Sequence, residues 1–569
     1  MPLKAPVLGG IALGIFCGRT LGEVAPEAPS RHVQTSFSST EEWNFNQTPS
    51  PNITSHWIFD NVNSLLQHWP NTRLRNGHTI VPGLIAPGTL LYHATTTHAI
   101  PTVPEWVATD PDHSYVYCHS PPVTGGDTGG EDGAMNKDTE DRDKGCWHLT
   151  LTPTRPLKVL YFDGSSAAKM WGGPMDSQDL LVWGRVRKER TFDERGRIEG
   201  LCKWGRGMGV DGFVRMQGDF EVMFCDFSAG LSVVSFLKLP SVDGGFFPYP
   251  TPSAAAFRLL EAGSWHNHFP GENRVRLDYS RLVSFYDTEL FPSLQTIRAG
   301  HERWDHRLEG ISKEDVDTLR VELERVMEGE WGTTKSDVDW QAVFSVVSTR
   351  HAERLEILRY LLRSLSTAPQ DETLAGLKQV HRQLTATLRP YLLHSVRPPP
   401  RAQASDLEWA VPAWVHCSTT HTRAVEMNPQ LTRSERLLSR AVRDTSKEIC
   451  RVLVGMWAEG KIHVLDIEEN PVSNLRGTSL KKLVENWKTK IEGLIAWLDW
   501  SVWARCEPAC SYEEMCYMPQ WPFFKHMPPG PTPDNPNKTE GVVRDRSSPD
   551  DDWDRPVPRC IRRIEPFGV

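Results

Sequence analysis

The sequence predicts an α+β protein built from a mixed domain of strands and helices, a mainly α-helical domain and a disulfide-rich tail. Three observations predict this order. Short runs rich in Val, Phe and Met, punctuated by Gly, dominate up to about residue 300, and such runs are typical of strands. From Ser312 onward apolar residues recur at helical spacing. Beyond residue 500, cysteines recur beside a segment rich in Pro and Asp.

The first residues decide the expected compartment. Lys4 precedes an apolar run from Val7 to Cys17, which has the length of a signal-peptide core and is too short to span a bilayer. Small residues at Thr20 and Gly22 suit a signal peptidase, so we expect residues 1–22 to be removed. A plain apolar N-terminus or a short signal anchor is the alternative. The mature chain is expected to be secreted, without a transmembrane span.

Cysteine usage and glycosylation signals agree with secretion. Removing Cys17 with the signal leaves an even number of cysteines, which in a secreted chain favours disulfides of unspecified connectivity. Asn46, Asn52 and Asn537 occupy Asn-x-Ser/Thr sites. No Cys-x-x-Cys pair occurs and the histidines lack metal spacing, so no metal site is predicted. The disulfide candidates are Cys118, Cys146, Cys202, Cys225, Cys417, Cys450, Cys506, Cys510, Cys516 and Cys560.

The formal net charge is −9, from 63 Lys and Arg against 72 Asp and Glu. This mild acidity argues against a nucleic-acid partner, which would favour a basic face.

The mixed domain is expected over residues 81–300, after a polar lead at 23–80 that contains a short helix at 57–69. Residues 104–117 predict one or two helical turns interrupted by Pro111. Residues 125–144 are acidic and Gly-rich, and we expect a disordered insertion there. Strands are expected at residues 90–95, 147–151, 157–162, 213–216, 220–224 and 231–239, with a further extension of the sheet at 275–285.

The helical domain is expected over residues 313–500 and the tail over 501–569. One helix is predicted at 340–365, and a second ends at Pro390. Thr432 and Glu435 have the spacing of a capping box that starts a third. A last apolar stripe runs from Leu480 to Leu498. In the tail, two disulfides are expected to pin Trp521 and its neighbours to the helices.

Glu221 is the unusual residue of the predicted strand pair 213–216 and 220–224. It lies among apolar neighbours, and burying an isolated charge is costly. One interpretation pairs it with Arg215 across the hairpin, because opposite charges on facing strands attract. The other makes it functional. The nearby Gly207–Gly212 satisfies Gly-x-Gly-x-x-Gly, but it precedes a strand instead of opening a helix, so a dinucleotide fingerprint is rejected.

Three segments taken in order resemble the ADP-ribosyltransferase-like fold of the His–Tyr–Glu type, over residues 85–240. They are Leu-Leu-Tyr-His-Ala-Thr at 90–95, Trp106 to Tyr115, and Gly-Val-Asp-Gly at 209–212 followed by the Glu221 strand. The resemblance implies a split-sheet domain and NAD as substrate, either for ADP-ribosyl transfer to an unknown acceptor or for NAD hydrolysis. The whole chain also looks like a group of secreted fungal proteins of unassigned function.

The resemblance assigns roles residue by residue. Glu221 would stabilise the oxocarbenium-like ribose as the catalytic carboxylate, and His93, Thr95 and Tyr115 would bind NAD. Tyr117 competes with Tyr115 for the stacking position.

Two departures from the family pattern limit this reading. Ala94 replaces the usual Gly, and Asp219 stands where a second Glu or Gln would lie. The alternative is a catalytically inactive secreted protein on the same fold that binds an unknown protein partner. A carbohydrate-active enzyme that uses Glu221 with Asp226 ranks lower, because strand alternation puts the two on opposite faces.

Overall fold

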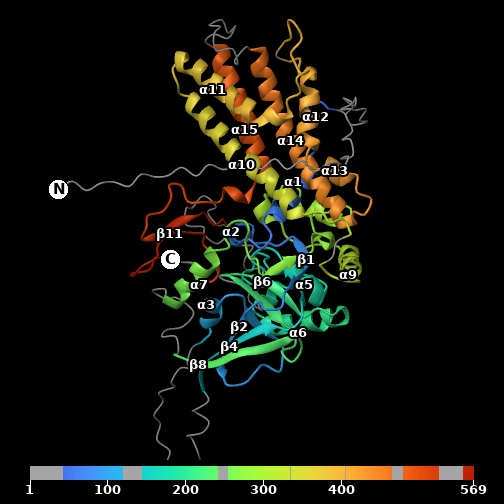
Figure 1. The fold of residues 1–569 in the computed structure, drawn as a ribbon, viewed down its shortest axis with the longest axis vertical. Coiled ribbons are helices and arrows are strands. Elements are labelled where there is room, and N and C mark those ends of the chain that lie inside the picture. The colour runs from blue at the N-terminus through green and yellow to red at the C-terminus, as the bar shows by residue number, and fades with distance from the viewer. Residues whose placement is uncertain are drawn as a thin grey trace, which may run out of the picture. The chain divides into compact units, whose positions relative to one another are not determined.

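A computed structural model describes residues 43–118, 144–240, 254–332, 335–403, 405–463, 478–523 and 555–568. Residues 45–569 form one compact unit, which combines a large mixed sheet, a group of long helices and a short two-stranded tail. The α+β class with a helical region and disulfides is therefore confirmed (Figure 1). The expected signal peptide at 1–22 and most of the insertion at 125–144 lie outside the described residues.

The main sheet has ten strands, in the order β10-β1-β5-β6-β7-β3-β2-β4-β8, and β9 pairs with β1 off this path. Pairing is antiparallel except between β5 and β6, whose connection carries α5 and α6. The predicted strands at 90–95, 147–151, 157–162, 213–216, 220–224 and 231–239 all lie within this sheet. Its strands are β1 Thr79–Ile85, β2 Leu91–Thr97, β3 Glu105–Ala108, β4 Lys144–Pro153, β5 Leu157–Phe162, β6 Gly212–Met216, β7 Phe220–Phe224, β8 Leu231–Leu239, β9 Val275–Leu277 and β10 Val283–Ser284.

Two local expectations were wrong. Residues 104–117 hold a strand, β3, followed by helix α3 (Pro111–Tyr115), which Pro111 begins instead of interrupting. Pro fits the first turn of a helix because the amide that it lacks would have no partner there, and the Asp110 carboxylate caps the same turn. Residues 57–69 fall in two short helices, α1 (Ser55–Asn63) and α2 (His68–Arg73).

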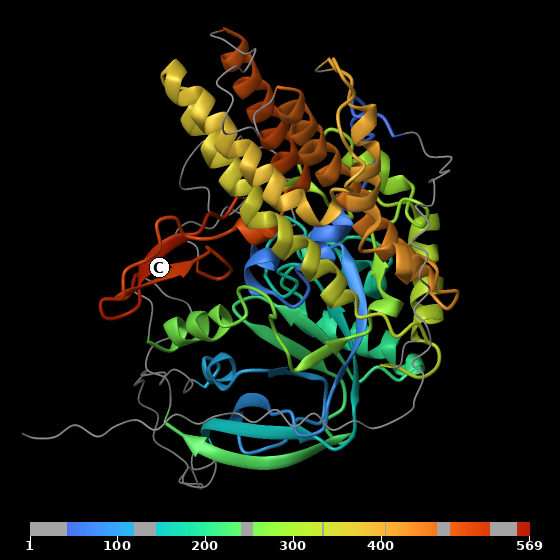
Figure 2. The same ribbon diagram turned by 45° about the horizontal axis from the view of Figure 1, so that its top comes forward.

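The long helices lie together on one side of the sheet region (Figures 1 and 2). The predicted helix at 340–365 is confirmed as α10, and the capping box starts α14, where Thr432 and Glu435 cap each other reciprocally. The structure describes eleven α-helices after α3. They are α5 Asp176–Trp183, α6 Glu194–Gly205, α7 Ala254–Ser264, α8 Ser293–Arg298, α9 Lys313–Met327, α10 Trp340–Leu365, α11 Gln370–Leu388, α12 Val411–Thr419, α13 Arg423–Glu426, α14 Arg433–Ile462 and α15 Thr478–Leu498.

The ten candidate cysteines form five disulfides. One ties α6 to the end of β7, one joins α12 to α14, and two lie in the tail, where β11 (Glu514–Tyr517) pairs with β12 (Arg559–Arg562). The pairs are Cys118–Cys146, Cys202–Cys225, Cys417–Cys450, Cys506–Cys516 and Cys510–Cys560.

Candidate active site

A pocket of about 270 Å³ opens where the main sheet divides. Strand β3 pairs along its whole length with β7, but it meets β2 at a single residue pair, Tyr92 with Ala108. Away from that pair β2 and β3 diverge, and the pocket lies between them. Its lining residues are Tyr92, His93, Ala94, Glu105, Trp106, Val107, Ala108, His113, Ser114, Tyr117, Lys169, Glu194 and Glu221.

His93 bridges the divergence between the two strands. Its Nδ1 lies 2.7 Å from the Trp106 carbonyl oxygen of β3, so the imidazole takes the place of the missing ladder bond. Burial lowers the pKa of His93, which keeps the ring neutral at pH 7. A neutral ring that donates from Nδ1 presents Nε2 as an acceptor, and Nε2 has no hydrogen-bond partner among the described residues. His93 Nε2 can therefore accept a hydrogen bond from a hydroxyl group of a ligand.

Glu221 lies on β7 directly opposite Arg215 on β6, and the two form a buried ion pair. This pairing across the hairpin is the first of the two interpretations that the sequence allowed. Glu221 Oε1 accepts from Arg215 Nη2 at 2.6 Å and from Nε at 3.2 Å. Its Oε2 has no hydrogen-bond partner in the part of the chain that the structure describes. The ion pair thus holds one carboxylate oxygen and leaves the other available at the pocket wall.

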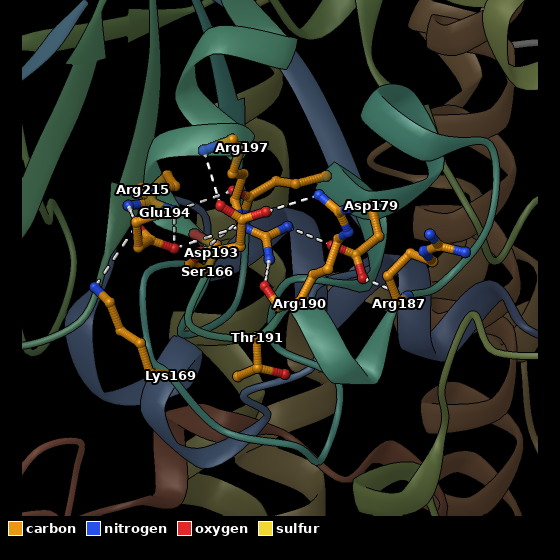
Figure 3. Close-up of polar contacts among 12 residues, drawn as sticks. Ser166, Lys169, Asp179, Arg187, Arg190, Thr191, Asp193, Glu194, Arg197 and Arg215 are labelled. Carbon is orange, nitrogen blue, oxygen red and sulfur yellow. Dashed lines mark hydrogen bonds and ion pairs between the residues drawn. The ribbon is translucent and has the colours of Figure 1, made fainter. Parts of the chain in front are cut away.

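A second carboxylate, Glu194, shares the same arginine (Figure 3). Asp193 caps α6 by accepting from the Gly196 amide, which places Glu194 in the first turn of that helix. Glu194 Oε2 lies 2.6 Å from Arg215 Nη2 and 3.7 Å from Lys169 Nζ. Burial alone would raise the pKa of Glu194, but Arg215, Lys169 and Arg197 outweigh it and lower this pKa to about 2.

The network continues into the core below the pocket. Arg197 contacts Asp179 and Glu194 (Figure 3). Arg215 Nη1 donates to Gln178 Oε1 at 3.2 Å. Both arginines are completely buried. Three cations, Lys169, Arg197 and Arg215, thus face the carboxylates of Asp179, Glu194 and Glu221, and the network balances charge as buried ion pairs require.

Helix α3 and the residues after it form a further part of the pocket lining. His113 Nδ1 contacts the Phe220 carbonyl oxygen at 3.3 Å, and burial lowers its pKa, so this ring is also neutral. Ser114 Oγ lies 2.7 Å from His148 Nε2. Tyr117 lines the pocket and is 39% exposed as a residue, with its hydroxyl 3.4 Å from Gln217 Nε2. This wall offers an aromatic face beside neutral polar groups.

The structure brings together some of the residues expected from the sequence. His93 and Glu221 line one pocket, whereas Tyr115 does not line it and donates its hydroxyl to the Pro240 carbonyl at 2.6 Å. Tyr117, the competing tyrosine, does line the pocket. Thr95 lines a neighbouring pocket of about 480 Å³ that shares His93, Ala94, Glu105 and Tyr117 with the first.

The pocket residues outside the segments singled out in the sequence are Glu105, Lys169 and Glu194. They come from a four-residue strand, a loop and a helix start, and no shared motif spacing links them. The Asp193 cap was the one local signal, because an Asp before a helical run marks the start of a helix and so places Glu194 in its first turn.

Glycoside hydrolysis needs a carboxylic acid that is protonated at working pH beside a carboxylate. Glu194 has a lowered pKa, and Glu105 pairs with Arg195. Asp226 is exposed and accepts from Ser228 in its own turn. The pair Glu221 and Asp226 is therefore not assembled at the pocket.

Among the described residues, Cys506, Cys510 and Cys560 have sulfur atoms close enough together to hold a metal ion. All three are in disulfides, so they offer no thiolate. No helix in the described ranges is both long and apolar enough to cross a membrane.

Comparisons with known proteins agree on one group. The model of the YPL277C N-terminal domain matches residues 51–129 and 123–256, a span that contains every pocket-lining residue. The chain is similar to two proteins of Saccharomyces cerevisiae. It is 25% identical to the uncharacterized protein YOR389W over 544 residues, which cover 82% of this chain and 81% of the yeast protein.

The second yeast protein is the uncharacterized protein YPL277C. It is 26% identical over 382 residues, which cover 54% of this chain and 75% of the yeast protein. No solved structure matches. The comparisons support the expected relation to fungal proteins of unassigned function.

Proposed function

We propose that the pocket binds NAD and that the protein cleaves the bond between nicotinamide and ribose, by ADP-ribosyl transfer or by NAD hydrolysis. The observation that carries the proposal is that His93 and Glu221, which lie 128 positions apart in the chain, line one pocket with an aromatic ring, Tyr117, at its wall. The order of the three segments that resemble ADP-ribosyltransferases points to the same chemistry.

Cleavage of the nicotinamide–ribose bond is favoured by a carboxylate beside the ribose. When the C1′–N bond breaks, nicotinamide leaves with the bonding electron pair and becomes neutral, and the ribose becomes an oxocarbenium-like cation. Water or an acceptor side chain then bonds to C1′ and gives up a proton. Oε2 of Glu221 would stabilise the cation and accept a hydrogen bond from a ribose hydroxyl. A fixed carboxylate stabilises a positive charge that develops beside it in the transition state.

The other residues would hold the substrate. His93 Nε2 would accept a hydrogen bond from a hydroxyl of NAD, and the Tyr117 ring would stack on the nicotinamide ring. The pocket at β2 and β3 suits the nicotinamide riboside half. The adjoining pocket, lined by Thr95, Thr96 and Thr97 and by the apolar residues Ile100 and Val103, would receive the remainder.

The test is nicotinamide release from NAD by purified wild-type protein and by Glu221→Gln. Glu221→Gln keeps the shape and removes the charge, so we expect release to fall by a factor of at least about 100. Asp226→Asn is the matched control, because it removes an exposed carboxylate of the next turn, and it should leave release unchanged. Equal rates for wild type and Glu221→Gln would reject the catalytic role.

A second function, ligand binding without catalysis, is favoured by the Arg215 ion pair. Arg215 neutralises Glu221 and would weaken its effect on a developing positive charge. In that case NAD binds to wild type and to Glu221→Gln alike, and neither protein releases nicotinamide. Binding and release, measured on the same preparations, separate the two functions.

We also propose that the protein passes through the secretory pathway. Five disulfides suit an oxidising compartment. The glycosylation candidates Asn46 and Asn52 are exposed, whereas Asn537 lies outside the described residues. Peptide-N-glycosidase treatment of protein from a fungal host should reduce its mass. An unchanged mass, together with a retained residue 1, would contradict this route.

A further inference from the structure

The described parts of the tail, residues 501–523 and 555–568, lie against the pocket walls, as well as against the helices where the sequence placed the tail. Strands β11 and β12 put Cys516 directly opposite Cys560. Cys516 is bonded to Cys506 and Cys560 to Cys510, so both strands are fixed to the segment that leaves α15. Arg505 anchors that segment on α10 through Glu353 and Glu356. The tail is therefore a closed unit with a defined attachment.

One contact of the tail is with the loop that carries Lys169. Trp521, which is 5% exposed, packs in one apolar cluster with Ala168 and Met170, the chain neighbours of Lys169. Trp171 lies at the edge of the same cluster. Because both neighbours of Lys169 rest on Trp521, the position of the Lys169 side chain at the pocket depends on the tail.

The same tryptophan also reaches the start of α6. The Phe192 ring lies 6.2 Å from the Trp521 ring in an edge-on arrangement, and 5.9 Å from the Trp171 ring. Phe192 precedes Glu194 by two residues. The aromatic group of Trp521, Phe192 and Trp171 thus joins the two segments whose charged side chains, Lys169 and Glu194, meet at the pocket.

A third contact reaches the segment that carries Tyr117. Tyr517, Phe523 and Ile561 of the tail form a buried cluster with Val116 and with Phe257, Leu259 and Leu260 of α7. Val116 is the residue before Tyr117. The tail therefore supports two parts of the pocket lining, one through Trp521 and the other through Val116.

We propose that the tail is a disulfide-closed clamp that positions Lys169, Glu194 and Tyr117 for ligand binding, so that opening its disulfides loosens the pocket. The tail residues are positioning residues, since none of them lines the pocket. For its ligand, this inference rests on the proposed NAD function. Its structural part concerns the mobility of the walls and does not depend on any ligand.

Opening the clamp is a balanced two-electron step. An external dithiol supplies two electrons and two protons, becomes a cyclic disulfide and leaves Cys506 and Cys516 as thiols. The sulfur atoms of Cys506, Cys510 and Cys560 lie within 4.8 Å of one another. A single freed thiolate at Cys506 could thus attack the neighbouring bridge. Test variants must therefore replace both partners of a bridge.

Hydrogen–deuterium exchange of the full chain tests the mobility of the walls. The Ala167 amide donates to the Met216 carbonyl at 2.9 Å, so its protection reports how firmly the Lys169 loop is attached to β6. In Trp521→Ala and in Cys506→Ser/Cys516→Ser, we expect peptides covering 165–171 and 190–196 to exchange at least about tenfold faster. Phe192→Ala should also increase exchange in these peptides. Because Phe192 is an exposed residue, this variant should fold normally.

Two matched controls separate the clamp from general destabilisation. Cys417→Ser/Cys450→Ser removes a bridge within the helical group, and Trp409→Ala removes a half-buried ring there. Neither control should change exchange at 165–171 or 190–196. Unchanged exchange in all three clamp variants, or equal acceleration by the controls, would overturn the proposal.

Ligand affinity gives the second readout. If wild type binds NAD, the clamp variants should bind it at least about fivefold more weakly while the controls bind normally. Faster wall exchange with unchanged NAD affinity would overturn the role of the clamp in binding. If wild type itself shows no NAD binding, the proposed function fails, and the exchange result alone decides whether the clamp exists.

Discussion

Arg215 is the cation that contacts both Glu194 and Glu221 at the pocket. It is completely buried, and its Nη2 lies 2.6 Å from an oxygen of Glu194 and 2.6 Å from an oxygen of Glu221. The cost of burying three charges is offset by their mutual contacts and by Gln178. The arginine therefore determines where both carboxylates point.

Replacing Arg215 by Met should lower the free energy of unfolding by about 3–5 kcal/mol, because Glu221 then stays buried without its cation, while Glu194 keeps Lys169 and Arg197. Arg155→Met is the control. Arg155 also binds a carboxylate, that of Asp211, through two hydrogen bonds, but 47% of its side chain is exposed. The control should cost at most about 1 kcal/mol. Urea unfolding monitored by tryptophan fluorescence measures both, and equal losses would contradict this account of the network.

Asp219, in the turn between β6 and β7, is a buried carboxyl group that no arginine or lysine contacts in an ion pair among the described residues. It is completely buried, and neither carboxylate oxygen has a hydrogen-bond partner among the described residues. Burial, and then the Glu272 carboxylate, raise its pKa to about 8. The unfolded value is about 3.9, so the folded state holds a proton on Asp219 at pH 7.

This residue should make stability depend on pH. Below about pH 4 the Asp219 carboxyl is protonated in both the folded and the unfolded state. As the pH rises from 4 towards 8, the unfolded state loses this proton first, so the free energy of unfolding decreases. Asp219→Asn should thus be stabilised relative to wild type by an amount that grows by about 1.4 kcal/mol per pH unit between about pH 4 and pH 8. Urea midpoints at pH 4.5, 6 and 7.5 measure the difference. A constant difference would show that Asp219 is ionised in the folded protein.

At the scale of elements, Thr432 is the start of the longest helix described. Its Oγ1 accepts from the Glu435 amide at 3.1 Å and donates to the Ser280 carbonyl at 2.7 Å, and Glu435 Oε2 accepts from the Thr432 amide at 2.8 Å. The residue therefore caps α14 and ties it to the turn between β9 and β10.

Thr432→Ala should lower the free energy of unfolding by about 1–2 kcal/mol through loss of the cap. Thr489→Ala is matched in chemistry but lies on the exposed side of α15, where its hydroxyl bonds only the Glu485 carbonyl. The control should change stability by less than about 0.5 kcal/mol. Chemical denaturation checks both variants. If Thr432→Ala costs no more than the control, the cap does not hold α14 in place.

The long helices and most strands were predictable because their apolar spacing extends over many residues. Strand β3 was not, because four residues between Pro104 and Pro111 are too few to show alternation, and its order comes from pairing with β7. The presence of Tyr117 at the pocket in place of Tyr115 also depends on packing between distant segments. Helix α3 ends at Tyr115, and the chain direction after it is set by Val116 packing against α7 and the tail.

The site was predictable where a strand carried an unexpected polar residue, as at His93 and Glu221. Glu194 and Lys169 could not be predicted, because they lie 27 and 52 positions before Glu221, on a helix start and a loop. Their meeting depends on the crossover from β5 to β6. The pairing of Glu221 with Arg215 follows from hairpin register, and that register could be read from the sequence.

For the whole molecule, the five disulfides define which segments are tied together. Peptide mapping under non-reducing conditions should find the pairs Cys118–Cys146, Cys202–Cys225, Cys417–Cys450, Cys506–Cys516 and Cys510–Cys560. Thiol titration of the denatured, unreduced protein should detect no free thiol once residues 1–22 are removed, since Cys17 leaves with them. A peptide joining Cys506 to Cys560 would contradict the arrangement of the tail.

The central claim is that the pocket between β2 and β3 binds NAD against Tyr117, and isothermal titration of NAD into three proteins tests it most directly. Wild type and Tyr115→Ala should bind with affinities within about a factor of three, because Tyr115 lies outside the pocket. Tyr117→Ala should bind about five- to tenfold more weakly, since it loses a stacking face worth about 1–1.5 kcal/mol. No binding by wild type, or equal affinities for all three proteins, would contradict the account.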